Sequence, residues 1–189
     1  AFRSDLGIGL ATTGASTFVT SDDPIAVVAA IERELGPRWV WWDRSIPDQL
    51  AERGVAIARC WDVLTVHRLL HGGWRTSIAL VWATLHGLPV ESLPTMGQLD
   101  LLSDHGEEGD PDHPIRPDGH LRPEWITGGW AASPDRLVRW AEITLATARL
   151  QQLRIDARDG ADRSTAHSES AAEFLCAELS VEGLPIDVA

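Results

Sequence analysis

The sequence predicts an α/β fold, and two stretches of the chain support this prediction. In residues 38–70, short aromatic and β-branched runs alternate with helical patterns, an order typical of parallel strands joined by helices. In residues 6–20, two apolar runs flank Thr13 and Gly14, which predicts a β-hairpin. A chain of 189 residues can bury one good core, so we expect one main domain.

Capping and breaking residues bound the other elements in the first half of the chain. A strand is expected where aromatic and β-branched residues cluster, and a helix where a capping side chain or a proline precedes an apolar periodic pattern. In chain order the sequence predicts a helix over 24–35, a strand over 38–42, a helix from Pro47 to Gly54, a strand over 55–58, a helix capped by Asp62 and ended by Gly72, and a helix over 76–86.

Residues 103–124 differ from the rest, since they combine four prolines and three glycines with many acids. This composition predicts a loop or a partly ordered insertion. The segment is either an exposed polar loop or a metal site, and its spacing matches no known ligand pattern. Its candidate ligands are Asp104, His105, Asp110, Asp112, His113, Asp118 and His120.

The last part of the chain predicts two helices. Ser133 is a good cap, and Pro134 and Asp135 suit a first helical turn, so a long helix should run from there to about residue 153. Residues 156–168 are polar and typical of a linker. A final helix is expected over 169–181.

Composition limits the classes of partner. The net charge of −12 opposes an extensive basic face for nucleic acid, although arginines can still gather locally. No apolar run is long enough to span a bilayer and no signal-peptide pattern is present, so we expect no membrane partner. Cys60 and Cys176 lie far apart and outside any CxxC pair, which favours a reduced, cytoplasmic protein.

Several motifs follow one another in a suggestive order. Trp42-Asp43 precedes Gly54-Val55, and the runs WDVLTVHRLL, RTSIALVWATLHGLP and RLVRWAEITLATARLQQL come after them. Together they resemble the 3′–5′ exonuclease domain of family A DNA polymerases, the DNA polymerase I-like enzymes. The resemblance implies a ribonuclease-H-like fold, a mixed sheet flanked by helices.

The tail extends this resemblance. ESAAEFLCAELSVEGLPID resembles the helix and turn that open the polymerase domain in an actinobacterial-type bifunctional 3′–5′ exonuclease/DNA polymerase. The resemblance therefore implies an exonuclease-like domain over 1–155. Residues 156–189 would be a linker and the first helix of a polymerase domain, so that the chain is the front part of a longer polymerase.

The family's metal-binding pattern is mostly missing. Active members hold two divalent metal ions with four carboxylates, but residues 6–20 lack the Asp-x-Glu pair of the first motif. The Tyr and Asp positions of the third motif fall on Arg136 and Trp140. Asp43 occupies the Asp position of the second motif, with a longer spacing to Gly54 than is usual. Asp43 is therefore the one candidate catalytic residue, as a vestige.

Three other residues receive structural interpretations. Asp62 and Glu142 match positions outside the metal cluster, and we expect a helix cap and a solvated helix residue, respectively. Trp140 replaces a metal-binding aspartate, and an indole cannot coordinate a hard cation. We expect Trp140 to be buried in the former cleft, packed near Trp42.

Three functions follow as hypotheses. The favoured one is a catalytically degenerate exonuclease-like domain with a structural or DNA-positioning role, with no cofactor and with DNA bound through the complete polymerase. The second is an active proofreading exonuclease using Mg²⁺ or Mn²⁺, in which Asp5, Asp22 or Asp23 would supply missing carboxylates. The third is a protein-interaction module with a protein partner, suggested by the net charge and the acidic segment.

Overall fold

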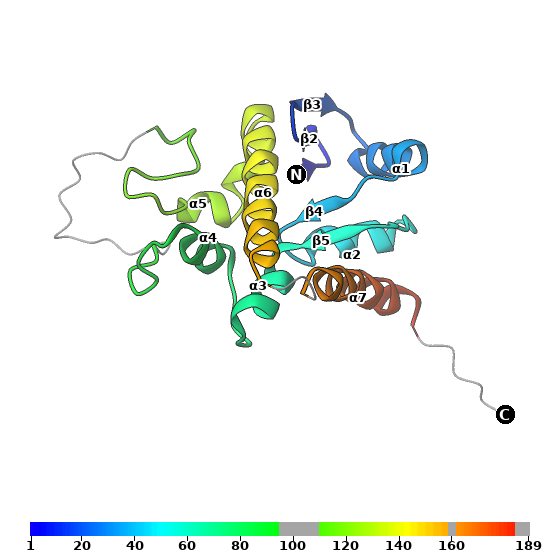
Figure 1. The fold of residues 1–189 in the computed structure, drawn as a ribbon. Helices are drawn as coiled ribbons and strands as arrows, with labels where there is room; N and C mark the ends of the chain where they lie inside the picture. The colour runs from blue at the N-terminus through cyan, green and yellow to red at the C-terminus, as the bar shows by residue number, and fades with distance from the viewer. Residues whose placement is uncertain (95–109, 159–161, 184–189) are drawn as a thin grey trace. The chain divides into compact units, whose positions relative to one another are not determined.

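The computed structural model describes residues 1–94, 110–158 and 162–183, and the chain forms two compact units. The first unit comprises residues 1–22 and 75–147, and the second comprises residues 23–74 and 148–189. Figure 1 shows helices together with two small sheets. The α/β prediction is therefore confirmed at this level.

The sheet of the first unit has three antiparallel strands. They are β1 (Phe2–Arg3), β2 (Gly7–Ala11) and β3 (Ser16–Thr20). The predicted hairpin is confirmed, because β2 and β3 pair with Gly9 opposite Phe18. A Cβ atom on Gly9 would lie 2.4 Å from the backbone carbonyl of Leu137. Only glycine permits this close approach of β2 to the helix that contains Leu137.

The helices of the first unit contain three buried tryptophans, Trp82, Trp125 and Trp140. These helices are α4 (Ile78–His86), α5 (Pro123–Ile126), the 3₁₀ helix η1 (Gly129–Ala131) and the first part of α6 (Pro134–Asp156). Ser77 caps α4, and Ser133 caps α6 as predicted; they accept hydrogen bonds from the N–H groups of Leu80 and Arg136, respectively.

Arg136 links three segments of the first unit. Its guanidinium donates to the carbonyl oxygens of Gly129 and Pro111 and to Asp112 Oδ1, the last at 2.8 Å. It also stands 5.0 Å from the centre of the Trp125 ring, a cation–π distance. Arg136 therefore holds segments of the chain that are far apart in sequence.

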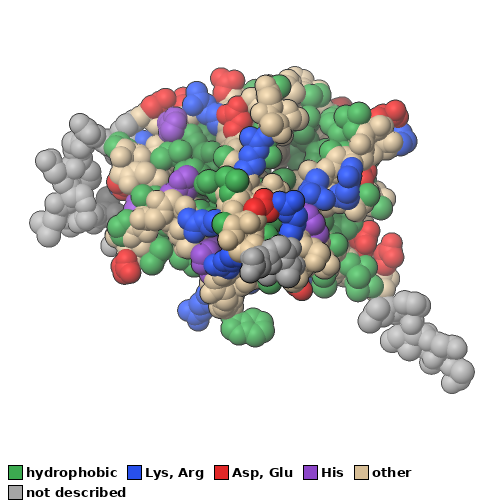
Figure 2. All heavy atoms as spheres, viewed as in Figure 1, with side chains coloured by type: hydrophobic (Ala, Val, Ile, Leu, Met, Phe, Trp, Pro, Cys, Tyr) green, Lys and Arg blue, Asp and Glu red, His purple; other side chains and the backbone are tan. Residues whose placement is uncertain are grey.

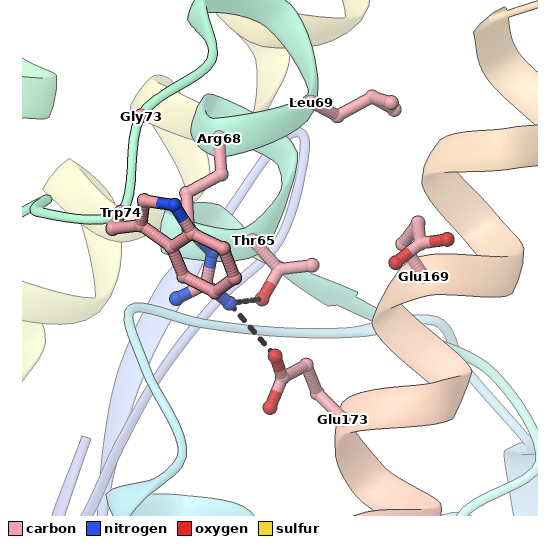
Figure 3. Close-up of a pocket in the computed structure, with 7 residues that line it drawn as sticks. All are labelled: Thr65, Arg68, Leu69, Gly73, Trp74, Glu169 and Glu173. Carbon is pink, nitrogen blue, oxygen red and sulfur yellow. Dashed lines mark hydrogen bonds and ion pairs between the residues drawn. The ribbon is translucent and has the colours of Figure 1, made fainter.

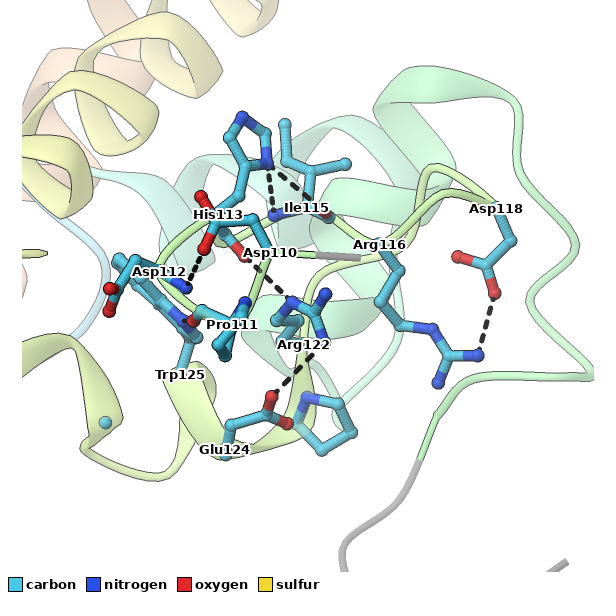
Figure 4. Close-up of polar contacts among 12 residues, drawn as sticks. Asp110, Pro111, Asp112, His113, Ile115, Arg116, Asp118, Arg122, Glu124 and Trp125 are labelled. Carbon is cyan, nitrogen blue, oxygen red and sulfur yellow. Dashed lines mark hydrogen bonds and ion pairs between the residues drawn. The ribbon is translucent and has the colours of Figure 1, made fainter. Parts of the chain in front are cut away.

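Residues 110–122 form a loop of turns, as composition predicted, and most of residues 110–119 are exposed. Ile115 pairs with Leu121 in an isolated bridge, and the side chains of Leu121, Arg122 and Trp125 are buried. Figure 4 shows Arg122 directed at the His113 carbonyl, at 2.9 Å from the donor, and the ring nitrogen of Trp125 directed at Pro111. The sequence predicted the loop but not these contacts, because they join positions that have no common periodicity.

The second unit contains one parallel strand pair. β4 (Trp39–Trp41) lies beside β5 (Cys60–Asp62), with Trp41 opposite Asp62. The helix α2 (Ser45–Glu52) falls between them in sequence, and α1 (Pro24–Leu35), α3 (Val63–His71) and α7 (Asp162–Glu182) complete the unit with the end of α6. The parallel pairing expected from the strand–helix–strand order is confirmed.

The position of the second parallel strand was predicted wrongly. The expected strand over 55–58 is not formed, since the Ala58 N–H donates to Glu32 Oε1 at 2.9 Å instead of to a strand. The strand is β5, which begins five residues later than expected. The reason is burial, because β5 places Trp61, which is fully buried, in the core of the unit.

The last two helices also differ from their predicted bounds. α6 continues to Asp156, and α7 begins at Asp162, so most of the predicted linker is helical. α7 packs against α2, β5 and α3. The boundary at residue 155 between an exonuclease-like domain and a polymerase segment remains a prediction.

Two surface properties bear on partners. In the described part of the chain, no helix has both the length and the apolar character needed to cross a membrane. Acidic side chains are scattered among basic and apolar ones on the face drawn in Figure 2.

Candidate functional site at the carboxyl ends of β4 and β5

The carboxyl ends of β4 and β5 bring together two acidic residues that the sequence singled out. Asp62 is the last residue of β5, and Asp43 lies two residues after the end of β4. In open α/β sheets, ligands bind at the carboxyl ends of parallel strands. This end of the strand pair is therefore the first place to look for chemistry.

The Asp62 carboxylate is buried and hydrogen-bonded on both oxygens. Its residue is 2% exposed. Oδ1 accepts from the Thr65 N–H at 2.8 Å and caps α3, as predicted, while Oδ2 accepts from Trp41 Nε1 at 3.2 Å. The Asp62 N–H donates to Ser170 Oγ on α7. Asp62 thus ties together β4, β5, α3 and α7.

This setting changes the acidity of Asp62. Burial raises the pKa of Asp62 to about 6, against the lowering effect of the hydrogen bonds from Thr65. The nearby Glu173 carboxylate also raises this pKa, and Arg68 lowers it. Burying a carboxylate costs free energy of folding, and the hydrogen bonds to the carboxylate offset part of that cost.

Asp43, the predicted vestigial site residue, forms a hydrogen bond with the backbone two residues further along the chain. Its Oδ1 accepts from the Ser45 N–H at 2.9 Å, at the turn into α2. The carbonyl of the preceding residue, Trp42, accepts from the Leu64 N–H at the start of α3. Local hydrogen bonds of this type are common for aspartate before a helix.

The three acids suggested as substitutes in the first strands are placed elsewhere. Asp5 is exposed and forms an ion pair with Arg3 at 2.6 Å. Asp23 caps α1 by accepting from the Ala26 N–H, and it pairs with Arg53 at 2.7 Å. Asp22 is exposed. Two of the three thus have identified structural partners.

The residues at the third-motif positions are used in packing. Arg136 makes the contacts described above. Trp140 is 4% exposed, as predicted, with ring centres of Trp125 at 6.3 Å and Trp130 at 6.4 Å. Trp42 belongs to the other unit, so the expected contact between Trp140 and Trp42 stays a prediction. Glu142 accepts from Ser16 Oγ of β3.

The acidic segment does not assemble its candidate ligands in the part that the structure describes. Asp112 is held by Arg136 and Asp118 by Arg116, while the rings of His113 and His120 contact the backbone oxygens of Ile115 and Pro89. Asp104 and His105 lie outside the described residues. Across residues 1–94, 110–158 and 162–183, no three His, Cys, Asp or Glu side chains are grouped to hold a metal ion.

A groove beside this end of the strands was missed by sequence reasoning. It has a volume of about 490 Å³ and lies between α3, the loop after it, and α7. Figure 3 shows Arg68 on α3 joined by dashed lines to Thr65 and to Glu173 of α7. The only local signal was Gly72-Gly73 before Trp74, a turn followed by an aromatic residue. The full lining is Thr65, Arg68, Leu69, Gly73, Trp74, Glu169 and Glu173.

Comparison with known proteins identifies no similar protein. Neither the family models, nor the curated proteins, nor the solved structures give a match to this chain. The resemblance to family A polymerases therefore rests on the motifs quoted from the sequence.

Proposed function

We propose that this chain is an exonuclease-like part of a family A DNA polymerase that lacks metal-dependent chemistry and has a structural or DNA-positioning role. The proposed fold is ribonuclease-H-like. Three antiparallel strands precede a parallel pair, and the aromatic-Asp pair, the Gly54-Val55 turn and α3 follow in the motif order of that family. This order supports the proposal.

The proposal rests mainly on the residues that α6 has at two motif positions. The family's third motif would place two site residues where this chain has Arg136 and Trp140. The first is committed to Gly129, Pro111 and Asp112, and the second is buried among tryptophans. Neither side chain is available to bind a hard cation.

The remaining carboxylates support the same conclusion. Asp43 and Asp62 both accept hydrogen bonds from backbone N–H groups at helix starts. A two-metal site needs several carboxylates converging on the ions, whereas these two carboxylates bind backbone N–H groups. We therefore assign no catalytic step to Mg²⁺ or Mn²⁺ in this chain.

A nuclease assay tests the proposal. The protein should leave 3′-labelled single-stranded DNA intact with Mg²⁺ or Mn²⁺, because most motif positions that supply metal-binding carboxylates in the family lack them in this sequence. Asp43→Ala should behave like the parent, and so should the control Asp48→Ala, which removes an acid of α2 that pairs with Arg44. Digestion that is lost in Asp43→Ala and kept in Asp48→Ala would overturn the proposal in favour of an active exonuclease.

A protein-interaction module is the second candidate. The groove between α3 and α7 favours it, because a nearly fully exposed tryptophan, Trp74, borders an open hollow. Tryptophan is enriched at protein interfaces.

A further inference from the structure

The single cation of the groove between α3 and α7 is already neutralised. Arg68 donates to Thr65 Oγ1 and to Glu173 Oε1, both at 2.7 Å. These two contacts fix the guanidinium within the groove wall. Arg68 is therefore poorly placed to attract a phosphate or another anion.

The groove keeps an excess of negative charge. Glu169 is exposed on α7, one turn before Glu173, and its carboxylate has no ion pair or hydrogen bond within the described residues. Figure 3 shows Glu169 and Glu173 on the same side of α7, across from α3. One arginine and two glutamates line the groove, so its formal charge is −1, and Glu173 lies close enough to Asp62 to act on that carboxylate electrostatically.

Trp74 adds an aromatic face to this acidic groove. Its side chain is 98% exposed, which is unusual for so large an apolar group. No guanidinium stands over its ring in the described part of the chain, whereas Arg136 occupies that position over Trp125 in the first unit. The face of the Trp74 indole is thus open to a ligand.

We propose that this groove binds an arginine side chain of a partner protein. A guanidinium stacks on indole faces and pairs with carboxylates, and the groove offers Trp74 for the first contact and Glu169 with Glu173 for the second. The aliphatic stem of the arginine packs on Leu69, which is 37% exposed. A nucleic acid fits this surface less well, because its phosphates would meet two carboxylates and one neutralised arginine. The proposal goes beyond the polymerase-domain hypothesis and does not depend on it.

The test uses the peptide acetyl-Gly-Arg-Gly-amide and its citrulline analogue, which has the same shape without the charge. Binding is followed by NMR through the indole N–H resonance of Trp74, identified by its absence from Trp74→Phe. The arginine peptide should shift this resonance in a salt-dependent manner, and the citrulline peptide should not.

Variants of the groove test which residues bind the peptide. Glu169→Gln should weaken binding about two- to fivefold. Trp74→Ala should weaken binding by a similar factor, and binding to this variant is measured through the shifts of other groove resonances. Glu182→Gln, an exposed acid of α7 outside the groove, should leave binding unchanged.

Three outcomes would overturn the proposal. One is an equal response to both peptides, which would mean that charge plays no part. Another is arginine binding that Glu169→Gln and Trp74→Ala leave intact, which would place the peptide elsewhere. The third is a larger Trp74 shift with a single-stranded oligothymidylate, which would make the groove a base-stacking surface. Each of these results leaves the nuclease assay, and with it the proposed function, unaffected.

Discussion

Replacing Trp140 with alanine should lower the free energy of unfolding by about 3–5 kcal/mol. The side chain is 4% exposed and packs between Trp125 and Trp130, the latter ring nearly parallel to it at an angle of 4°. Removing the indole leaves a cavity that rigid aromatic neighbours fill poorly. Urea denaturation of the parent and of Trp140→Ala measures the loss.

Trp140→Asp separates packing from chemistry. It restores the acid that the family resemblance expects at this position, yet it buries a carboxylate without a partner. We expect this variant to be at least as unstable as Trp140→Ala and to gain no nuclease activity. Trp74→Ala is the matched control, because Trp74 is 98% exposed and its loss should leave stability unchanged. If Trp140→Ala and Trp74→Ala unfold alike, the tryptophan packing described for the first unit is wrong.

Asp62→Asn should change how the stability of the protein depends on pH. Burial raises the pKa of Asp62 from its ordinary value of 3.8 to about 6. At a pH below 3.8 the carboxyl group is protonated in both the folded and the unfolded protein. As the pH rises to about 6, the group ionises more readily in the unfolded protein, so the stability contributed by the raised pKa is lost. Asparagine keeps an oxygen that can cap α3 and does not ionise.

The free energy of unfolding of Asp62→Asn, relative to the parent, should therefore rise with pH. The shift corresponds to roughly 3 kcal/mol between about pH 4 and pH 7. Urea midpoints of both proteins at several pH values measure it. Since only Asp62 differs, other titrating groups cancel to a first approximation. A difference that stays constant with pH, or that falls as the pH rises, would show that the Asp62 carboxylate is not held in a desolvated site.

Local signals in the sequence predicted many helix ends correctly. Asp62 and Ser133 cap helices as expected, and Asp23 and Ser77 cap the helices expected over 24–35 and 76–86. Such caps can be predicted because the contact joins residues only three apart. The hairpin over 6–20 and β4 were also foreseen. Each of these elements is encoded by neighbouring residues.

Elements that depend on distant partners were misplaced. β5 is only three residues long, and it forms because β4 pairs with it and because Trp61 is buried, with Nε1 donating to Gln151 at 2.9 Å. The start of α7 has a polar composition typical of a linker, but Ala166 and Ser170 are buried. Tertiary packing outweighed local propensity at both places.

The candidate site was predictable only in part. Spacing alone indicated that Asp62 caps α3, but its second partner, Trp41, comes from the neighbouring strand. The groove could not be foreseen, because it requires α3 and α7 to lie side by side with Arg68 reaching Glu173. A sequence pattern does not predict which two helices pack against each other.

We expect the carboxylates of Asp43 and Asp62 to bind backbone N–H groups rather than metal ions. Titration with Mn²⁺, followed by the paramagnetic broadening of amide NMR signals, tests this most directly. The two amides to follow are those of Ser45 and Thr65, which donate to these carboxylates. We predict that both signals broaden no more than exposed amides elsewhere. Selective broadening of both, abolished by Asp43→Ala, would contradict the claim and indicate a metal site at this end of the strands.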